Sequence, residues 1–296
     1  MRVGQLKCST IQIQIPNYTH DSTWAKKTWS GYTRAKGDSI WSDGNNIYFS
    51  SGDTVQYVLN GDTWTAKTWS GKIPTYGNSV WTDGTNIYYS YGSNQYVLNG
   101  DTWTTKSWSG LTSFDGSNIW SDGTNIYFSS SSGQYVLNGN KWSTKTWNGF
   151  TPTMANRLWS DGTNVYYSQS SSHYVLNGDT WTTKTWSGLT SFDGYKTWTD
   201  GTNIYYSSSP NNYALNGDTW TTKTWSGTTY LHGDYMWTDG TSIYFSNNSS
   251  QYVLERTVVP EVTDISPAYR KVNGTWVKQT AYQRQNGEWV LLSTAE

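Results

Sequence analysis

The chain has 296 residues, a formal net charge of -1 at pH 7 and a mean hydropathy of -0.72, and charged residues make up 14% of it. This charge balance excludes a basic stripe for nucleic acid and a polybasic membrane anchor, and the absence of an apolar stretch of about 18 residues argues against membrane insertion. The 20 Trp, 24 Tyr and 6 Phe exclude a disordered chain, because aromatic rings can build a core where aliphatic residues are scarce.

Residues 1–22 are predicted to be an N-terminal extension. The segment MRVGQLKCSTIQIQIPNYTHD lacks the continuous apolar run of a signal peptide. Work outside a cell would therefore require a route other than classical secretion. Cys8 is the single cysteine of the sequence, which excludes an intrachain disulfide and a multi-cysteine metal site.

An internal repeat dominates residues 23–257. Tryptophans fall in six triplets with one internal spacing, and the repeat period is 40 residues once and 39 residues thereafter. Such a period is the signature of a repeat architecture. The triplets are Trp24, Trp29 and Trp41; Trp64, Trp69 and Trp81; Trp103, Trp108 and Trp120; Trp142, Trp147 and Trp159; Trp181, Trp186 and Trp198; and Trp220, Trp225 and Trp237.

Each repeat is predicted to form four short strands. In the unit SVWTDGTNIYYSYGSNQYVLNGDTWTTKSW, strand a lies around Trp81, strand b covers Ile87–Ser90, strand c covers Gln95–Asn99 and strand d covers Trp103–Trp108. The Asp-Gly and Asn-Gly pairs between them predict tight hairpins with type I′ turns. Aromatic and aliphatic side chains alternate on both sides of strand b, so both faces of the sheet must be covered.

Six such units predict an all-β protein, a six-bladed β-propeller of four-stranded antiparallel blades. An open solenoid would need atypical end repeats, and the first and last repeats here resemble the middle ones. The chain opens with a d-type strand at Thr23–Trp29, while the sixth repeat has strands a, b and c only. The N-terminal strand is therefore predicted to complete the last blade and close the ring.

The repeat resembles the kelch-type propellers. The likeness is carried by strand b as IYYS, strand c as QYVLNGDTW and the Trp at the start of strand d, and it covers about 230 residues. Ser and Asn mostly replace the paired glycines that kelch repeats carry after strand b, as in SSSSG at residues 129–133. The resemblance implies a propeller, and it keeps open the function of a protein-interaction scaffold.

Strand d carries a lysine in every repeat. If strand d is the outer edge of each blade, these lysines are expected to discourage pairing with other sheets. They are Lys27, Lys67, Lys106, Lys145, Lys184 and Lys223.

The two ends of the strands differ in how far the repeats agree. The a-to-b and c-to-d turns are nearly constant and lie on one side of the predicted disc, which we call the turn face. The b-to-c and d-to-a loops vary, lie on the other side, which we call the loop face, and predict a ligand-binding surface rich in Tyr, Ser and Asn. The d-to-a loops contribute Lys36, Asp38, Tyr76, Asn78, Asp115, Ser117, Met154, Asn156, Arg157, Asp193, Tyr195, Lys196, His232, Asp234 and Tyr235. The b-to-c loops contribute Asp53, Tyr91 and His173.

Catalytic chemistry is not indicated. Glycoside hydrolysis usually needs two carboxylates that flank one bond, yet residues 23–254 contain no Glu, and Asp115 and Asp193 occupy equivalent positions two repeats apart. His232 and Asp234 are better explained as loop residues than as metal ligands. We expect no catalytic residues, no metal, no cofactor and no enzymatic activity.

The composition changes after the last repeat. Residues 258–296 begin with a linker, VVPEVTDISP, and continue as YRKVNGTWVKQTA and YQRQNGEWVLLST, which repeat at a 13-residue spacing. Each Asn-Gly pair predicts a β-hairpin, so this region is predicted to be a small C-terminal hairpin module. Such VNGxW hairpins resemble the ends of phage and prophage structural proteins from Gram-positive hosts.

This resemblance, the variable loop face and the lack of a signal peptide together predict a virion component, a tail-tip or fibre protein that binds a host-surface glycan or protein. The hairpins would then contact other virion proteins. The chain would be cytoplasmic during assembly and extracellular on the virion after lysis. A soluble carbohydrate-binding lectin and an intracellular kelch-like scaffold remain as alternatives.

Overall fold

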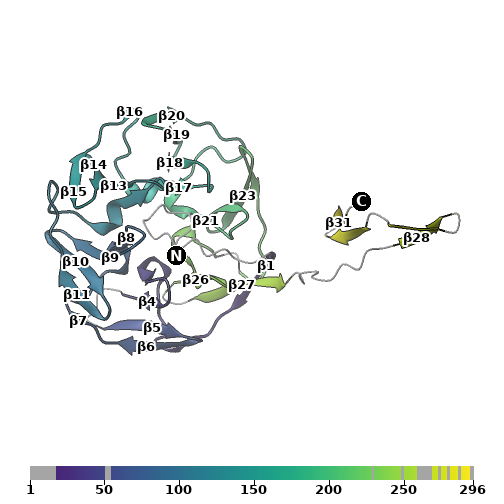
Figure 1. Cartoon of the computed structure of the whole chain (residues 1–296), viewed down its shortest axis with the longest axis horizontal. Coiled ribbons are helices and arrows are strands. Elements are labelled where there is room, and N and C mark those ends of the chain that lie inside the picture. The colour runs from purple at the N-terminus through teal and green to yellow at the C-terminus, as the bar shows by residue number, and fades with distance from the viewer. Residues whose placement is uncertain are drawn as a thin grey trace. The chain divides into compact units, whose positions relative to one another are not determined.

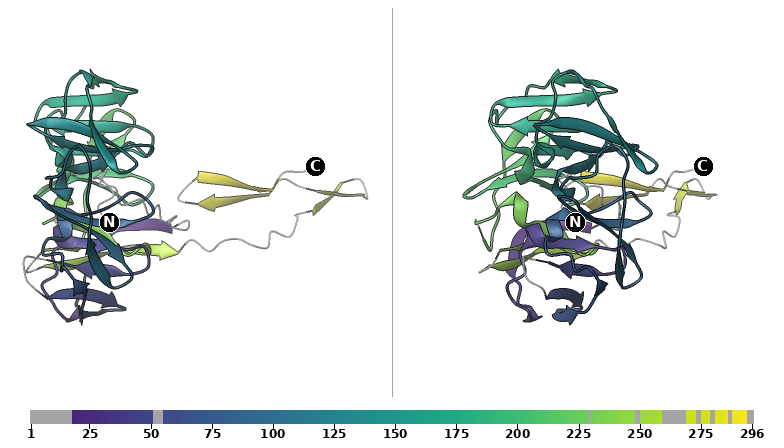
Figure 2. Two further views of the ribbon diagram at one scale, coloured as in Figure 1. Left: turned by 60° about the vertical axis from the view of Figure 1, so that its left-hand side comes forward. Right: turned by 90° about the vertical axis from the view of Figure 1, so that its left-hand side faces the viewer.

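The computed structural model describes residues 18–50, 55–228, 230–247, 250–258, 269–272, 275–278, 281–285 and 288–293. The chain forms two units, of which the first contains His20–Arg256 and the second contains Thr257–Glu296. The first unit is an all-β, six-bladed propeller, and its sheets follow one another around a ring (Figure 1). Figure 2 shows this unit from two further sides. None of the described helices has the length and apolar character needed to cross a membrane.

The blades contain the four strands in the order in which the repeat was divided. Strand a is β3 (Ile40–Ser42), β8 (Val80–Thr82), β12 (Ile119–Ser121), β17 (Leu158–Ser160), β21 (Thr197–Thr199) and β25 (Met236–Thr238). Strand b is β4 (Ile47–Phe49), β9 (Ile87–Tyr91), β13 (Ile126–Ser130), β18 (Val165–Gln169), β22 (Ile204–Ser208) and β26 (Ile243–Ser246). Strand c is β5 (Gln56–Asn60), β10 (Asn94–Asn99), β14 (Gly133–Asn138), β19 (Ser172–Asn177), β23 (Asn211–Asn216) and β27 (Gln251–Val258). Strand d is β6 (Thr63–Lys67), β11 (Thr102–Thr105), β15 (Lys141–Thr144), β20 (Thr180–Thr183) and β24 (Thr219–Thr222), with β1 (Tyr18–Lys26) in this position of the sixth sheet.

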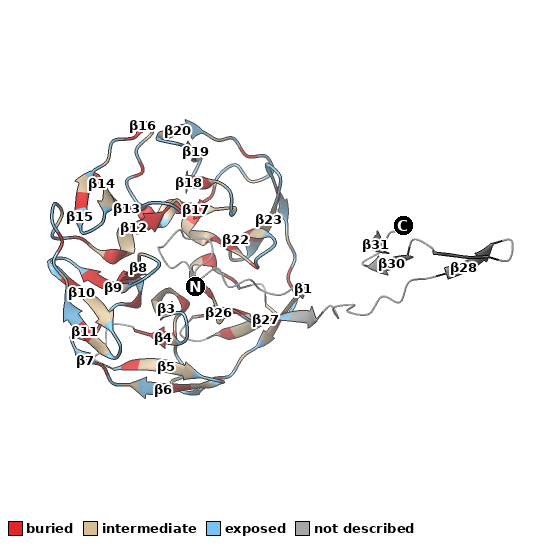
Figure 3. Cartoon of the chain, in the orientation of Figure 1, coloured by how far each residue is buried: buried red, intermediate tan, exposed pale blue. Residues whose placement is uncertain are grey.

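Both faces of strand b are buried, as its sequence predicts. In β9, Tyr88 and Tyr89 point to opposite sides of the sheet and are 4% and 2% exposed. Figure 3 shows the buried residues concentrated on the inner strands, with exposed residues along the outer strands and loops. Each blade is therefore a sheet packed between two neighbours, which is what closure into a propeller requires.

Tryptophans form the contact between neighbouring blades. Between blades 1 and 2, Trp41, Trp69 and Trp103 lie with ring centroids 5.9 to 6.0 Å apart, and two of the three contacts are edge-to-face. The Trp41 Nε1 donates to Ser50 Oγ at 3.0 Å. Since each ring can bury roughly 150–250 Å², these contacts supply the core that the few aliphatic residues could not. The equivalent clusters are Trp81, Trp108 and Trp142; Trp120, Trp147 and Trp181; Trp159, Trp186 and Trp220; Trp198, Trp225 and Trp24; and Trp237, Trp29 and Trp64.

Strand d is shorter than predicted. β11 ends at Thr105, whereas the sequence suggested a strand that reaches Trp108. The last backbone bond to strand c is donated by the Lys106 N–H to Gln95 O at 2.8 Å, and the chain beyond it turns so that the Trp108 ring packs between two blades.

A fifth strand extends three of the sheets. β2 (Ser30–Gly31), β7 (Ser70–Gly71) and β16 (Asn148–Gly149) pair in parallel with strand d of the following blade. Single parallel bridges lie at the equivalent places elsewhere, and they join Ser109 to Lys141, Ser187 to Thr219 and Thr23 to Ser226. The prediction of purely four-stranded antiparallel blades was therefore incomplete, because the segment after each strand d also hydrogen-bonds to the next blade.

The a-to-b turns are organised by aspartate and are not type I′ turns. In blade 2, Asp83 Oδ1 accepts from the backbone N–H groups of Thr85 and Asn86 at 2.9 and 2.7 Å. Its Oδ2 accepts from the Tyr88 hydroxyl at 2.7 Å. Gly84 has a φ of 90°, but Asp83 lacks the positive φ that a type I′ turn needs at both central residues. The aspartate side chain therefore takes over the hydrogen bonds of the turn. The same carboxylate–tyrosine bond joins Asp43 to Tyr48, Asp122 to Tyr127, Asp161 to Tyr166, Asp200 to Tyr205 and Asp239 to Tyr244.

The lysines of strand d connect blades. Lys67 Nζ lies 2.6 Å from Asp101 Oδ1, in the c-to-d turn of the next blade, and its side chain is 21% exposed. The same ammonium group lies 4.7 Å from the centroid of the Trp69 ring. Lys67 therefore also interacts with a carboxylate and an indole ring, and its expected role in discouraging pairing with other sheets stays a prediction. The equivalent ion pairs are Lys27–Asp62, Lys145–Asp179 and Lys184–Asp218.

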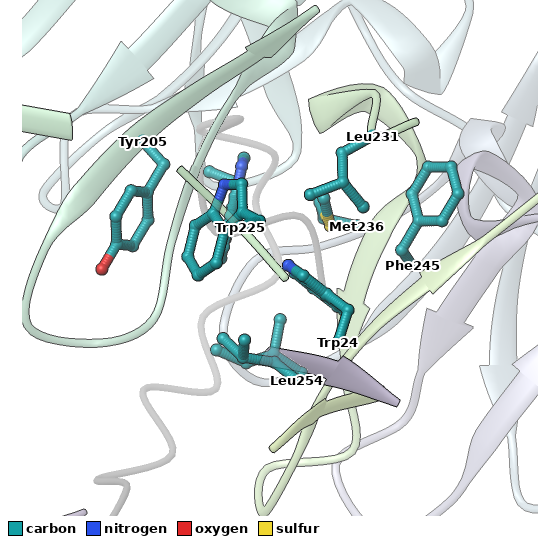
Figure 4. Close-up of a cluster of buried hydrophobic side chains, with 9 residues drawn as sticks. Trp24, Tyr205, Trp225, Leu231, Met236, Phe245 and Leu254 are labelled. Carbon is teal, nitrogen blue, oxygen red and sulfur yellow. The ribbon is translucent and has the colours of Figure 1, made fainter. Parts of the chain in front are cut away.

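β1 lies beside β27 in the sixth sheet, whose order is β1-β27-β26-β25. The backbone N–H of Trp24 donates to Ser226 O at 2.9 Å, and that of Lys27 donates to Gln251 O at 2.8 Å. Figure 4 shows the Trp24 ring among buried side chains that include Trp225. The role of this strand in holding the ring closed stays a prediction. Of the predicted N-terminal extension, residues 1–17 lie outside the described residues, and β1 starts at residue 18.

The second unit contains two pairs of antiparallel strands. β28 (Tyr269–Val272) pairs with β29 (Thr275–Lys278), and β30 (Ala281–Gln285) pairs with β31 (Glu288–Ser293). The Asn-Gly pairs at residues 273–274 and 286–287 lie outside the described residues. The C-terminal hairpin module as a whole stays a prediction.

Candidate functional site

A ring of short helices lies at the inner end of the d-to-a loops. Each 3-10 helix ends directly before the strand a of its blade. Each helix also contacts the helix of the next blade, and the last helix, η6, contacts the first, η1. The propeller therefore gathers all six d-to-a loops around its axis. The helices are η1 (Gly37–Ser39), η2 (Gly77–Ser79), η3 (Gly116–Asn118), η4 (Ala155–Arg157), η5 (Gly194–Lys196) and η6 (Gly233–Tyr235).

Close approach of neighbouring helices fixes the first residue of most of them. A Cβ added to Gly194 would lie 2.0 Å from Arg157 O, and one added to Gly77 would lie 2.2 Å from Ser39 O. Ala155 occupies this position in η4 and is buried. Backbone packing thus constrains the first helical residue, while the residue before it and the two after it can differ from blade to blade.

Most of the predicted binding residues lie on this ring. The residues that precede the helices are Lys36, Tyr76, Asp115, Met154, Asp193 and His232. The second and third helical positions hold Asp38, Asn78, Ser117, Asn156, Arg157, Tyr195, Lys196, Asp234 and Tyr235. Tyr91 ends β9 and reaches the ring from a b-to-c loop. Asp53 lies outside the described residues.

His173 is placed differently from the prediction. It is 4% exposed, lies within β19 and stacks on Phe192 with a centroid distance of 4.6 Å. Its Nε2 lies 3.0 Å from Thr190 O. Burial lowers the pKa of His173, which favours the neutral ring. The other repeats have a buried Gln or Asn at this position, so His173 belongs to the core and is left out of the binding surface.

Basic and aromatic side chains gather where blades 4 and 5 meet. Arg157 pairs with the Asp193 carboxylate, and its guanidinium carbon lies 4.7 Å from the centroid of the Tyr195 ring. Lys196 Nζ lies 5.4 Å from the same centroid and donates to Ser208 Oγ at 2.9 Å. The cluster has two cations and one carboxylate, so a positive charge is left on this part of the loop face.

A second charged group joins blades 6 and 1. Lys36 Nζ lies 3.3 Å from Asp38 Oδ2 and 5.0 Å from the centroid of the Tyr235 ring. Burial alone would lower the pKa of Lys36, but attraction to Asp38 and Tyr235 outweighs burial and raises it. His232 Nδ1 lies 3.6 Å from Asp234 Oδ1. Within the described part of the chain, no three His, Cys, Asp or Glu side chains come together in a group that could hold a metal ion.

The part of the loop face that belongs to blade 2 is aromatic. The Tyr76 and Tyr91 rings lie with centroids 5.1 Å apart. Nearby in the ring of helices, Asp115 Oδ1 accepts from Ser79 Oγ at 2.9 Å and from the backbone N–H of Ser117 at 2.9 Å. The loop face therefore offers neighbouring patches of different chemistry.

Exposed large hydrophobic side chains of the described chain lie in the b-to-c and d-to-a loops. The side chains are Val55 (45% exposed), Tyr76 (41%), Tyr91 (44%), Met154 (45%) and Tyr230 (62%). The sequence prediction missed Val55 and Tyr230. In the d-to-a loops it compared only fixed distances from the second tryptophan, and from the b-to-c loops it took only Asp53, Tyr91 and His173. An unmatched aromatic two residues before His232 was the signal that could have found Tyr230.

Comparison with known proteins supports no argument beyond the fold. The sequence matches no protein-family model and no curated protein. Among solved structures, the extracellular domain of a hybrid two-component system from B. thetaiotaomicron is 10% identical with a TM-score of 0.45, and the match covers 81% of this chain and 41% of that one. Virginiamycin B lyase from Staphylococcus aureus is 8% identical with a TM-score of 0.43, covering 82% of this chain and 100% of the lyase. BamB from Moraxella catarrhalis is 12% identical with a TM-score of 0.42, covering 81% and 98%.

Proposed function

We propose that this chain is a non-enzymatic recognition protein whose loop face binds a glycan or protein on a host surface, as a tail-tip or fibre component of a phage or prophage virion. The observation that carries the proposal is the location of the exposed large hydrophobic side chains in the loops of one face. Exposed apolar groups rimmed by polar residues are typical of interaction surfaces. Tyr rings in particular give a large contact area at a low cost in conformational entropy.

The scaffold supports this use. Glycine-to-carbonyl contacts between the 3-10 helices and tryptophan clusters between the blades hold the loops on a rigid frame. A rigid site loses little conformational freedom on binding, which favours affinity. Because equivalent loop positions carry different side chains, the same scaffold can present charged, aromatic and apolar groups to a ligand.

The virion setting rests on the C-terminal sequence. The VNGTW and QNGEW segments resemble the ends of phage and prophage structural proteins. On this proposal the hairpins contact other virion proteins, and the chain reaches the outside of the cell by lysis. Neighbouring genes that encode tail proteins would support this setting, and a gene neighbourhood without them would favour a lectin or a kelch-like scaffold.

Binding of the fluorescently labelled protein to intact Gram-positive cells and to their purified walls tests the proposal. We expect saturable binding that the combined variant Tyr76→Ala, Met154→Ala, Tyr230→Ala loses. The matched control is Thr85→Ala, Thr124→Ala, Thr163→Ala, which changes three exposed residues of the turn face and is expected to bind like the natural protein. Equal binding by both variants, or no binding to any cell or wall, would contradict the proposal.

The non-enzymatic part has its own test. Walls incubated with the protein should release no reducing sugar ends and no soluble fragments above the buffer background. Release that disappears in Asp193→Asn or Asp234→Asn would instead show a glycan-cleaving enzyme.

A further inference from the structure

The aromatic sector of the loop face consists of two exposed rings on fixed backbone. Tyr76 precedes η2 and Tyr91 ends β9, so regular elements position both residues. Their ring planes are inclined by 34° at a centroid distance of 5.1 Å, and the side chains are 41% and 44% exposed. The two rings therefore present one adjoining apolar surface to solvent.

A carboxylate lies in the same neighbourhood. Asp115 belongs to the next blade, and its Oδ1 is oriented by Ser79 Oγ and by the backbone N–H of Ser117. Burial raises the pKa of Tyr89, and the nearby Asp115 and Tyr76 contribute to the rise. Through its bond to Ser79, Asp115 lies beside η2, the helix that Tyr76 directly precedes.

The equivalent carboxylate two blades further on has a different partner. Asp193 is paired with Arg157, the last residue of η4. The last residue of η2, which faces Asp115 in the same way, is Ser79. A neutral hydroxyl thus replaces the cation, and the charge of Asp115 is not cancelled from this position.

We infer that Tyr76, Tyr91 and Asp115 form a subsite for a neutral pyranose ring of a host-surface glycan, an inference that rests on the proposed function. A pyranose has an apolar face of C–H groups and a rim of hydroxyl groups. The C–H face fits the negative face of a tyrosine ring, and the rim hydroxyls can donate charge-assisted hydrogen bonds to a carboxylate. A sulfated, phosphorylated or sialylated sugar would be repelled by the charge of Asp115.

An array of neutral and anionic oligosaccharides tests the inference, followed by calorimetric titration of the best neutral hexose or N-acetylhexosamine oligomer. Tyr76→Ala and Tyr91→Ala are each expected to weaken binding about tenfold or more. Tyr76→Phe keeps the ring and should bind within about twofold of the natural protein. Asp115→Asn should weaken binding without abolishing it, because the amide retains one acceptor oxygen.

Thr85→Ala is the matched control. Thr85 is an exposed residue of the turn face in the same blade as Tyr91. It should leave the affinity for the neutral oligosaccharide within about twofold. All the substituted residues are partly or largely exposed, and unchanged melting temperatures would show that the variants are folded.

The outcomes separate this inference from the proposed function. Binding to cells that requires the loop face, but that is unchanged by Tyr76→Ala and Tyr91→Ala, overturns the inference and leaves the function standing. The same holds if only anionic glycans or only proteins bind, or if Thr85→Ala weakens sugar binding as much as Tyr76→Ala. Absence of binding to any host surface would contradict both.

Discussion

The turn face has the same residues at equivalent positions of the six blades, whereas the loop face has different residues at its equivalent positions. On the turn face, six aspartates bind the tyrosine five residues later and the backbone of their own turn. On the loop face, the residues that precede the six helices are Lys, Tyr, Asp, Met, Asp and His. Polar groups that are already satisfied within the fold have little left to offer a ligand, whereas exposed rings and loosely paired charges do. The comparison separates residues that hold the frame from residues available for recognition.

Loss of the ring itself would disrupt both faces, so the largest effect is expected from Trp24→Ala. Trp24 is 1% exposed and packs against Trp198 and Trp225. Truncation should lower the free energy of unfolding by about 3–5 kcal/mol, measured by urea denaturation. Lys26→Ala, an exposed change on the same strand, should alter it by less than about 0.5 kcal/mol. If Trp24→Ala is as stable as the natural protein, β1 does not hold the ring closed.

On the turn face, Asp83→Ala should cost about 2 kcal/mol, because it removes the acceptor of two backbone N–H groups and of the Tyr88 hydroxyl. Asp101→Ala serves as the control. It removes a carboxylate that is 72% exposed and paired with Lys67, and such surface pairs contribute only about 0–1 kcal/mol. Equal losses in the two variants would mean that the aspartate network does not organise the turn.

Stability should also fall at both ends of the pH range. Burial alone would raise the pKa of Asp83, but hydrogen bonds from Asn86, Tyr88 and Thr85 outweigh it and lower the pKa. A lowered pKa gives stability that is present above about pH 4 and is lost as the pH falls through the folded-state value. Burial and the bond to Asp83 raise the pKa of Tyr88, so its contribution is present below about pH 10 and is lost as the pH rises from there.

Urea denaturation as a function of pH measures this effect. The same lowered carboxyl pKa occurs at Asp43, Asp122 and Asp161. The Asp83→Asn variant should lose less stability on acidification than the natural protein does. An identical acid profile for the two proteins would assign the pH dependence to other groups.

The smallest effect on stability is expected on the loop face. Tyr76→Ala and Tyr230→Ala change exposed side chains, and each should alter the free energy of unfolding by less than about 0.5 kcal/mol. Both should weaken binding to the host surface. A loop-face variant that loses stability as much as Asp83→Ala would remove the distinction between the two faces.

Much of the propeller scaffold could be predicted because the same sequence pattern occurs in six repeats. The tryptophan spacing gave the number of blades, and the Asp-Gly and Asn-Gly pairs located the turns. The end of strand d at Thr105 and the ion pair of Lys67 with Asp101 could not be predicted, because both depend on the neighbouring blade. Comparison of the six repeats with one another shows which positions are constant, but it does not show which residues of the neighbouring blade they contact.

The loop site was predicted in position and only partly in content. Counting from the second tryptophan located the residues around the six helices. The residues taken from the b-to-c loops included His173, whose burial follows from packing on Phe192 and from the Thr190 carbonyl, a loop contact that spacing cannot show. The pairing of Arg157 with Asp193 was equally hidden, since it joins two blades.

Hydrogen exchange measured by mass spectrometry, with and without soluble wall fragments of a host that the protein binds, tests the central claim most directly. Slower exchange is expected in peptides that contain residues 72–79, 111–118, 150–157, 189–196 or 228–235. Peptides that contain the a-to-b turns, such as residues 82–87, should be unchanged. Protection confined to those turns, with unchanged exchange in the d-to-a loops, would contradict the assignment of recognition to the loop face.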